Sequence, residues 1–222
     1  MNRYQRYAIY YLPRPESALA ALGRKWLGID PETGERAPPP SLWIESPRRY
    51  GFHATLKAPM RLADGIAETD LLKEVSELAN KLDPVNLGAL RLSRLGSFLA
   101  LINDQVKFPE VTDLAWRCVT TLDPLRAPLS EAEISRRKNI TPAQHALLVK
   151  WGYPFVGPEF RFHMTLSSSL TTTQLDEAEA VLAPSLIDVL EQDIILDQLS
   201  VLGDPGNSMP FELVRRFNLK GL

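Results

Sequence analysis

The chain contains the same short motif twice, and both copies carry residues that can move protons. The motif is Phe-His-x-Thr-Leu, at residues 52–56 and again at residues 162–166. Two of the three histidines occupy its second position, 110 residues apart (163 − 53). Because a histidine of ordinary pKa, about 6.5, can accept or donate a proton near neutral pH, two of them at one site would supply a general base and a general acid.

Strand geometry predicts which motif residues lie together. Both copies sit in apolar, β-prone surroundings, and successive side chains of a strand point to opposite faces. The apolar motif residues would therefore face a core, while the polar residues share the other face. The predicted polar faces carry His53, Thr55 and Lys57 in the first copy, and Arg161, His163, Thr165 and Ser167 in the second.

The two threonines narrow the chemistry. Each hydroxyl lies two residues after a histidine, about 6–7 Å along a strand. It could bind a non-bridging oxygen while the histidine acts on an attacking or leaving oxygen. Two such donors on opposite sides of a tetrahedral anion indicate phosphate. Lys57, Arg161 and Ser167 would add charge or hydrogen bonds as negative charge develops.

The same residues argue against a metal site. Zinc usually takes three or four protein ligands, and the motifs offer two histidines with no carboxylate at ligand spacing. We therefore expect no metal and no cofactor. The third histidine, His145, follows Pro142 in a predicted helix and has no matching partner, so a structural or surface role is expected.

Composition limits the class of protein. The 222 residues are 45% hydrophobic and 23% charged, as in a soluble globular protein of one large domain or two small lobes. The net charge of −2 excludes a general polyanion-binding surface. Because Cys118 is the single cysteine, no internal disulfide can form, which is compatible with a reducing cytoplasm. We expect Cys118 to be buried in a helix. No signal peptide or membrane span is predicted.

Hydrophobic spacing and turn residues predict alternating strands and helices. Residues 28–46, including Pro38-Pro39-Pro40, are expected to form a loop or flap. The predicted helices are 15–27, 69–82, 108–122, 130–137, 142–151 and 171–182, with Thr141 capping the fifth. Besides the first motif, the predicted strands are 7–12, 85–92, 98–102, 160–169, 194–202 and 211–219.

The two halves align beyond the motif. Each continues with a helix, a strand ending in Leu-Gly and a partner strand; the Leu-Gly pairs at 95–96 and 202–203 are offset by 107 residues (202 − 95). A duplicated β-α-β-β unit explains this register. The predicted fold is α+β, with two lobes of antiparallel sheet flanked by helices around a central groove. We expect a single domain with the first lobe at about 50–104, a helical middle segment at about 107–152 and the second lobe at about 157–219.

Paired His-x-Thr-Leu motifs in duplicated lobes resemble the 2H phosphoesterase superfamily, which includes RNA 2′,3′-cyclic phosphodiesterase/2′-5′ ligase proteins and nucleotide cyclic phosphodiesterases. Residues 49–59, with residues 6–10, resemble most the branch encoded beside phosphonate-metabolism genes. The resemblance implies that His53 and His163 are the acid/base pair, that Thr55 and Thr165 bind phosphate oxygens, and that cyclic phosphodiesters are opened without metal. Tyr50 joins the candidates for substrate contact.

Three functions follow as hypotheses. The first is hydrolysis of a cyclic phosphate of a ribose-derived metabolite or nucleotide, in phosphonate metabolism. The second is an enzyme acting on short RNA ends, and the third is a non-catalytic phosphate- or nucleotide-binding module. The basic run at residues 136–138 is expected on a solvated face, the alternative being a phosphate or RNA contact near the cleft. Tyrosines of the first strand are expected to pack, with lining of the groove as the alternative.

Overall fold

The computed structural model describes residues 2–38 and 41–221, so Pro39 and Pro40 of the predicted flap lie outside the described residues. The strands are β1 (Arg6–Tyr11), β2 (Ala54–Met60), β3 (Val85–Ala89), β4 (Arg91–Leu95), β5 (Phe98–Ile102), β6 (His163–Thr165), β7 (Asp193–Leu196), β8 (Gln198–Asp204) and β9 (Glu212–Asn218). The α-helices are α1 (Ala18–Leu27), α2 (Glu45–Arg48), α3 (Glu68–Ala79), α4 (Glu110–Leu122), α5 (Glu131–Ser135), α6 (Pro142–Trp151), α7 (Thr172–Leu182) and α8 (Ile187–Leu190). Short 3-10 turns are η1 (Leu42–Ile44), η2 (Asp123–Leu125), η3 (Gly157–Glu159) and η4 (Ala183–Ser185).

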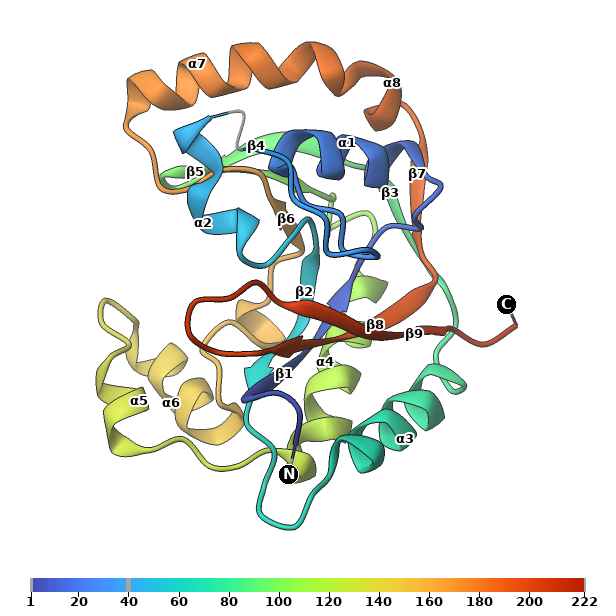
Figure 1. Ribbon diagram of the computed structural model, residues 1–222, viewed down its shortest axis with the longest axis vertical. Helices are drawn as coiled ribbons and strands as arrows, with labels where there is room; N and C mark the ends of the chain where they lie inside the picture. Colours follow the sequence, from blue (N-terminus) through green and yellow to red (C-terminus); the bar gives the residue numbers. More distant parts are fainter. Residues whose placement is uncertain (1, 39–40, 222) are drawn as a thin grey trace.

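The predicted α+β class with antiparallel sheets is confirmed. A seven-stranded sheet has the order β4-β5-β6-β2-β1-β8-β9, and β3 pairs with β7 in a second sheet (Figure 1). The motif strands β2 and β6 are direct neighbours at the middle of the large sheet. The strands on the two sides of this pair occupy matching positions: β5 lies next to β6 as β1 lies next to β2, and β4 follows β5 as β8 follows β1. This symmetry agrees with a duplicated unit in which β1, rather than the predicted β9, takes the place of the partner strand.

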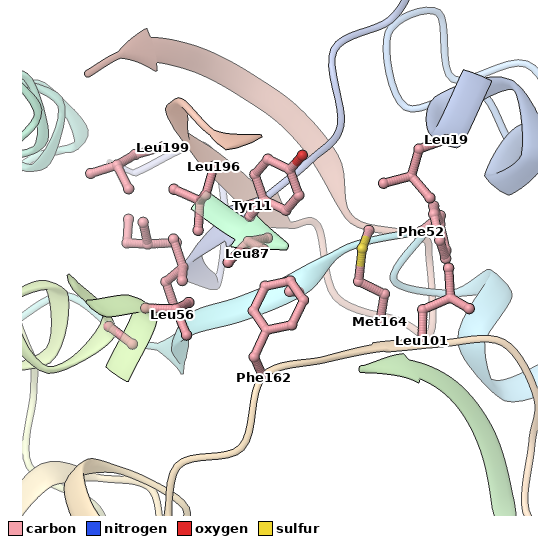
Figure 2. Packing of buried hydrophobic residues seen from close by; sticks show 14 of the residues in the cluster. Tyr11, Leu19, Phe52, Leu56, Leu87, Leu101, Phe162, Met164, Leu196 and Leu199 are labelled. Carbon is pink, nitrogen blue, oxygen red and sulfur yellow. The ribbon is translucent and has the colours of Figure 1, made fainter. Parts of the chain in front are cut away.

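The two faces of the large sheet are covered differently. Buried residues of α1, α3, α4 and α7 join one continuous hydrophobic core on one face. Figure 2 shows Phe52, Leu56, Phe162 and Met164 of the two motifs within this core. On the opposite face Ala8, Tyr10, Leu12, Leu202 and Phe211 form a small separate cluster. The predicted apolar faces of the motifs are therefore buried, and the polar faces look away from the main core.

Local signals explain the helix boundaries. Ser17 accepts a hydrogen bond from the Ala20 amide at the start of α1, and Gly28 ends it with φ 63°. Thr141 caps α6 as predicted, with Pro142 at the first position. A Cβ on Gly23 would lie 2.3 Å from the Phe52 ring, so α1 packs directly against the first motif. Among the described helices, none is long and apolar enough to cross a membrane.

Three predicted strands differ from expectation. The strand predicted at 194–202 is divided at Asp197 between β7 of the small sheet and β8 of the large sheet. The strand predicted at 85–92 is divided, because the chain leaves the small sheet after β3 and enters the large sheet at β4. The strand predicted at 160–169 is only three residues long. After Thr165 the amides of Leu166 and Ser167 both donate to the Leu99 carbonyl, which ends the regular ladder. Side-chain alternation consequently stops before Ser167.

Candidate active site

The pairing of β2 with β6 brings the two motifs together. Ala54 lies opposite Met164 in an antiparallel register. One residue further in each direction, His53 lies opposite Thr165 and Thr55 lies opposite His163. Directly opposed residues have Cβ atoms about 4.5–5.5 Å apart. The four polar side chains therefore alternate, His and Thr, around the Ala54–Met164 pair.

A backbone carbonyl orients each histidine ring. Nδ1 of His53 lies 2.9 Å from the Gly51 carbonyl oxygen, and Nδ1 of His163 lies 2.7 Å from that of Arg161. A carbonyl oxygen only accepts, so each Nδ1 carries a proton and donates it. Nε2 is therefore the position left for proton transfer in both rings, and in a neutral ring it is an acceptor. Gly51 has φ +70°, a conformation that suits glycine.

A tyrosine ring stacks on the first histidine, and burial lowers the pKa of that histidine. The rings of Tyr10 and His53 are stacked, with centroids 3.8 Å apart and planes at 19°. Burial lowers the pKa of His53 to about 4; the hydrogen bond to Gly51 opposes this shift and the nearby His163 adds to it. The Thr55 hydroxyl lies 3.3 Å from Nε2 and can donate to it. His53 is therefore a neutral proton acceptor near pH 7.

The second histidine has different aromatic neighbours. His53 and His163 are both partly exposed, but the Phe98 ring near His163 lies at a centroid distance of 6.0 Å and is tilted by 54° instead of stacked. On the neighbouring strand β5, Ala100 lies opposite Thr165. Tyr10 holds the corresponding place on β1, opposite Thr55. The small side chain of Ala100 leaves His163 without the stacked ring that covers His53.

A cleft of about 320 Å³ opens over the first motif. The cleft is lined by His53, Thr55 and Thr165. His163 is not part of this lining and lies opposite Thr55 on the neighbouring strand. Tyr50 lines it too, as predicted for a contact residue, with its ring centroid 6.3 Å from that of His53. The other lining residues include Arg6, Tyr10, Ser46, Pro47, Arg137 and Tyr153.

Lys57 does not share the face of His53 and Thr55, contrary to the prediction from alternation. Thr55 pairs with Tyr10 but Lys57 pairs with Ile9, so β2 has one extra residue between them. This β-bulge reverses the alternation and turns Lys57 toward α4. There Nζ donates to the Val119 carbonyl at 3.1 Å and lies 3.5 Å from Asp123.

Ser167 and Arg161 have different surroundings from those expected. Ser167 is buried; its hydroxyl accepts from the Leu99 amide and donates to the Ser168 carbonyl, both at 2.9 Å. These bonds commit it to the structure at the end of β6. Arg161 has an exposed side chain, and its backbone carbonyl is the group that contacts His163.

Sequence reasoning gave the remaining walls of the cleft only as alternatives or not at all. Lining of the groove was the alternative prediction for the tyrosines of the first strand, and Tyr10 lines the cleft. Arg137 belongs to the basic run for which a phosphate contact was the alternative prediction, and the structure puts it in the lining of the cleft. Tyr153 follows α6 and has no spacing relation to either motif, so no local signal marks it.

The described residues contain no group of three or more histidine, cysteine, aspartate or glutamate side chains arranged to hold a metal ion. His145 is exposed on α6, and Cys118 is buried in α4, both as expected. The site thus consists of imidazoles, hydroxyls and guanidinium groups.

Fold and site together define an α+β protein whose two central strands each present a histidine and a threonine to one centre, in keeping with the resemblance to the 2H phosphoesterases. The chain belongs to the family described as "Protein of unknown function (DUF1045)", which matches residues 55–212.

Two curated relatives share one name, Ribose 1,5-bisphosphate phosphokinase PhnN. The protein from Janthinobacterium sp. (strain Marseille) is 40% identical over 185 residues, which are 77% of this chain and 40% of that protein. The protein from Laribacter hongkongensis (strain HLHK9) is 31% identical over 219 residues, 95% of this chain and 51% of that protein. The chain therefore spans about half the length, or less, of these relatives.

Among solved structures, Kluyveromyces marxianus Usb1 is similar, with a TM-score of 0.42 and 10% identity over 98% of this chain and 99% of that one. The same protein with uridine monophosphate gives a TM-score of 0.39 over the same shares of the two chains.

Proposed function

We propose that this protein is a metal-independent cyclic phosphodiesterase that uses two histidines for acid/base catalysis. The observation that carries the proposal is the register of β2 and β6, which alternates His53, Thr165, His163 and Thr55 around one centre. A tetrahedral phosphate at this centre would meet two threonine hydroxyls and two imidazoles whose Nδ1 atoms are bound to backbone carbonyls, and it would draw the Thr55 hydroxyl away from Nε2 of His53.

The different surroundings of the two histidines support a division of roles between them. His53, held neutral by burial beside Tyr10, accepts a proton from water at Nε2 as the water oxygen attacks phosphorus. His163, which lacks the stacked tyrosine, takes the role of the general acid in this proposal. As the bond from phosphorus to the leaving ester oxygen breaks, Nε2 of His163 gives that oxygen its proton. Exchange with solvent then restores both rings.

The threonines would bind the two non-bridging oxygens. Hydroxyl donors on both sides hold the phosphate between the imidazoles and stabilise charge as the fifth oxygen approaches. A ribose-derived small molecule is the favoured substrate class. The names of the curated relatives refer to a ribose phosphate, and the 320 Å³ cleft suits a small molecule. This choice agrees with the resemblance to the phosphonate-associated branch.

The test is hydrolysis of a small panel in the presence of a chelator: nucleoside 2′,3′-cyclic phosphates, ribose 1,2-cyclic phosphate and a short RNA with a cyclic end. His53→Ala and His163→Ala should each lower kcat/KM by about 10²–10⁴-fold, while His145→Ala, on the exposed face of α6, should match the wild type. Turnover that survives either motif substitution would exclude the mechanism. RNA as the best substrate would favour the RNA-end function, and no turnover at all would favour a binding module.

A further inference from the structure

A second cavity, of about 360 Å³, adjoins the cleft, and we call it the arginine pocket. The two cavities share Arg6, Arg137 and Tyr153 among their walls, so a molecule in one lies next to the other. The pocket is defined by six basic residues and one acidic residue in its lining, although the whole chain has slightly more acidic than basic residues. These are Arg6, Lys57, Arg61, Arg126, Arg136, Arg137 and Glu133.

Ion pairs with carboxylates neutralise only part of the positive charge of the arginine pocket. Asp123 forms ion pairs with both Arg126, at 2.8 Å, and Lys57, at 3.5 Å. Arg61 contacts Glu133 at 2.9 Å. Asp204, itself buried, is shared by two further arginines, one of which lines the pocket. Three carboxylates therefore face the six cations of the pocket, and one of the three, Asp204, is also shared with Arg49 outside it.

Two arginines at the mouth keep their charge available. Arg136 and Arg137 are exposed, and neither forms an ion pair with a carboxylate of the described residues. The Arg137 guanidinium lies 5.7 Å from the centre of the Tyr153 ring, which holds it at the boundary between the two cavities. A planar guanidinium presents two parallel N–H donors, which suit a phosphate group.

We infer that the arginine pocket binds a second phosphate group of the substrate, so that the substrate is a cyclic phosphodiester carrying a separate phosphate monoester. This inference rests on the proposed function of the adjoining cleft. Arg137 is the specificity residue, because it alone among the unpaired arginines lines both cavities. Lys57, turned here by the bulge in β2, adds a buried amine to the wall.

The chemistry of Lys57 fits this role. Burial lowers the pKa of its ammonium group to about 8, and Asp123 acts in the opposite direction. A phosphate dianion in the pocket would stabilise the charged form, as an opposite charge close to a buried amine does. The alternative occupant of the pocket, a nucleobase stacked on Tyr153 or Trp151, requires no second phosphate.

The kinetic test uses two matched pairs: ribose 1,2-cyclic phosphate and uridine 2′,3′-cyclic phosphate, each with and without a phosphate on C5 of the ribose. The wild type should prefer the phosphorylated member of a pair through a lower KM. Arg137→Gln should reduce that preference about 10–100-fold, the range expected for a charge-assisted contact. Lys138→Gln removes one charge from the next residue, which lines neither cavity, and should keep the preference.

A binding test separates this inference from the proposed function. Ribose 5-phosphate, titrated calorimetrically into the full chain, needs no turnover. Its affinity should fall about 10–100-fold in Arg137→Gln and stay unchanged in Lys138→Gln. Weakened binding without turnover of any panel member would overturn the proposed function and support the pocket. Turnover with no phosphate preference, and equal affinity in both variants, would overturn the pocket alone. A uridine substrate favoured irrespective of its phosphate would assign the pocket to a base.

Discussion

The two copies of the motif share a sequence pattern and a hydrogen bond from Nδ1, yet their histidines have different neighbours. Tyr10 covers His53, whereas Ala100 holds the equivalent place beside His163. The backbone just before each motif therefore orients the ring, and the adjoining strand decides whether an aromatic ring stacks on it. The repeated motif provides two imidazoles, and one difference between the flanking strands supports our proposal that His53 is the base.

The largest expected effect comes from making the first copy resemble the second. Tyr10→Ala opens His53 to water, so its pKa should rise from about 4 toward 6.5. The acid limb of the kcat/KM profile, where the base becomes protonated, should move up with it. Loss of a fully buried aromatic ring should also cost roughly 3–5 kcal/mol of unfolding free energy, measured in urea.

Tyr10→Phe is the matched control for this change, because it keeps the stacked ring and should leave the acid limb near pH 4. An unchanged limb in Tyr10→Ala would show that the stack does not control the proton affinity of His53.

A second prediction concerns stability in acid. The pKa of His53 is about 4 in the folded state, against about 6.5 when unfolded, so between these values the unfolded chain binds more protons. Stability should therefore fall as pH decreases from 6.5 to 4, with His53 contributing up to roughly 3 kcal/mol. His53→Gln should flatten that part of the curve, whereas His145→Gln should not. Parallel curves for wild type and His53→Gln would contradict the assignment.

The third prediction concerns the two threonines. In the proposed mechanism each binds one non-bridging phosphate oxygen, so loss of either hydroxyl should have a similar effect on kcat/KM, although the two histidines have different roles. Thr55→Val and Thr165→Val each remove one hydroxyl donor without changing side-chain shape. Each should lower kcat/KM by about 10–100-fold, and the corresponding serine variants should keep most of the activity. A large loss at one position with none at the other would place the phosphate away from the centre of the register.

The smallest expected effect on turnover is at Ser167. Ser167→Ala leaves the buried Leu99 amide without its acceptor, which should cost about 1–3 kcal/mol of unfolding free energy with kcat/KM nearly unchanged. A fall in kcat/KM at unchanged stability would instead support the substrate contact predicted from strand alternation.

Sequence periodicity predicted the parts of the site that lie within regular structure. Alternation placed His53 with Thr55 and His163 with Thr165, helical spacing predicted α3, and the Thr141-Pro142 cap predicted α6. It failed at Lys57 and Ser167, because a bulge follows Thr55 and the strand ends after Thr165. Neither irregularity has a marker residue in the sequence, since both depend on hydrogen bonds to distant strands.

The walls of the site could not be predicted for a different reason. Arg6, Arg137 and Tyr153 come from segments far apart in the sequence and meet only through the tertiary fold. Their residue types suit phosphate binding, but no spacing links them. Likewise, the swap of β1 into the place predicted for β9 depends on the order of strands in the sheet, which local patterns do not encode.

The near-twofold register of β2 and β6 has a consequence for regiochemistry. Four groups related by such an axis can hold a cyclic phosphate in two orientations, each presenting a different ester oxygen to the same acid. The centre alone would thus yield two isomeric monoesters. A single product requires the asymmetric surroundings, the Tyr10 stack on one side and the arginine pocket beside it, to select one orientation. The ratio of the two isomeric products would therefore measure how strongly these surrounding residues favour one orientation of the bound substrate over the other.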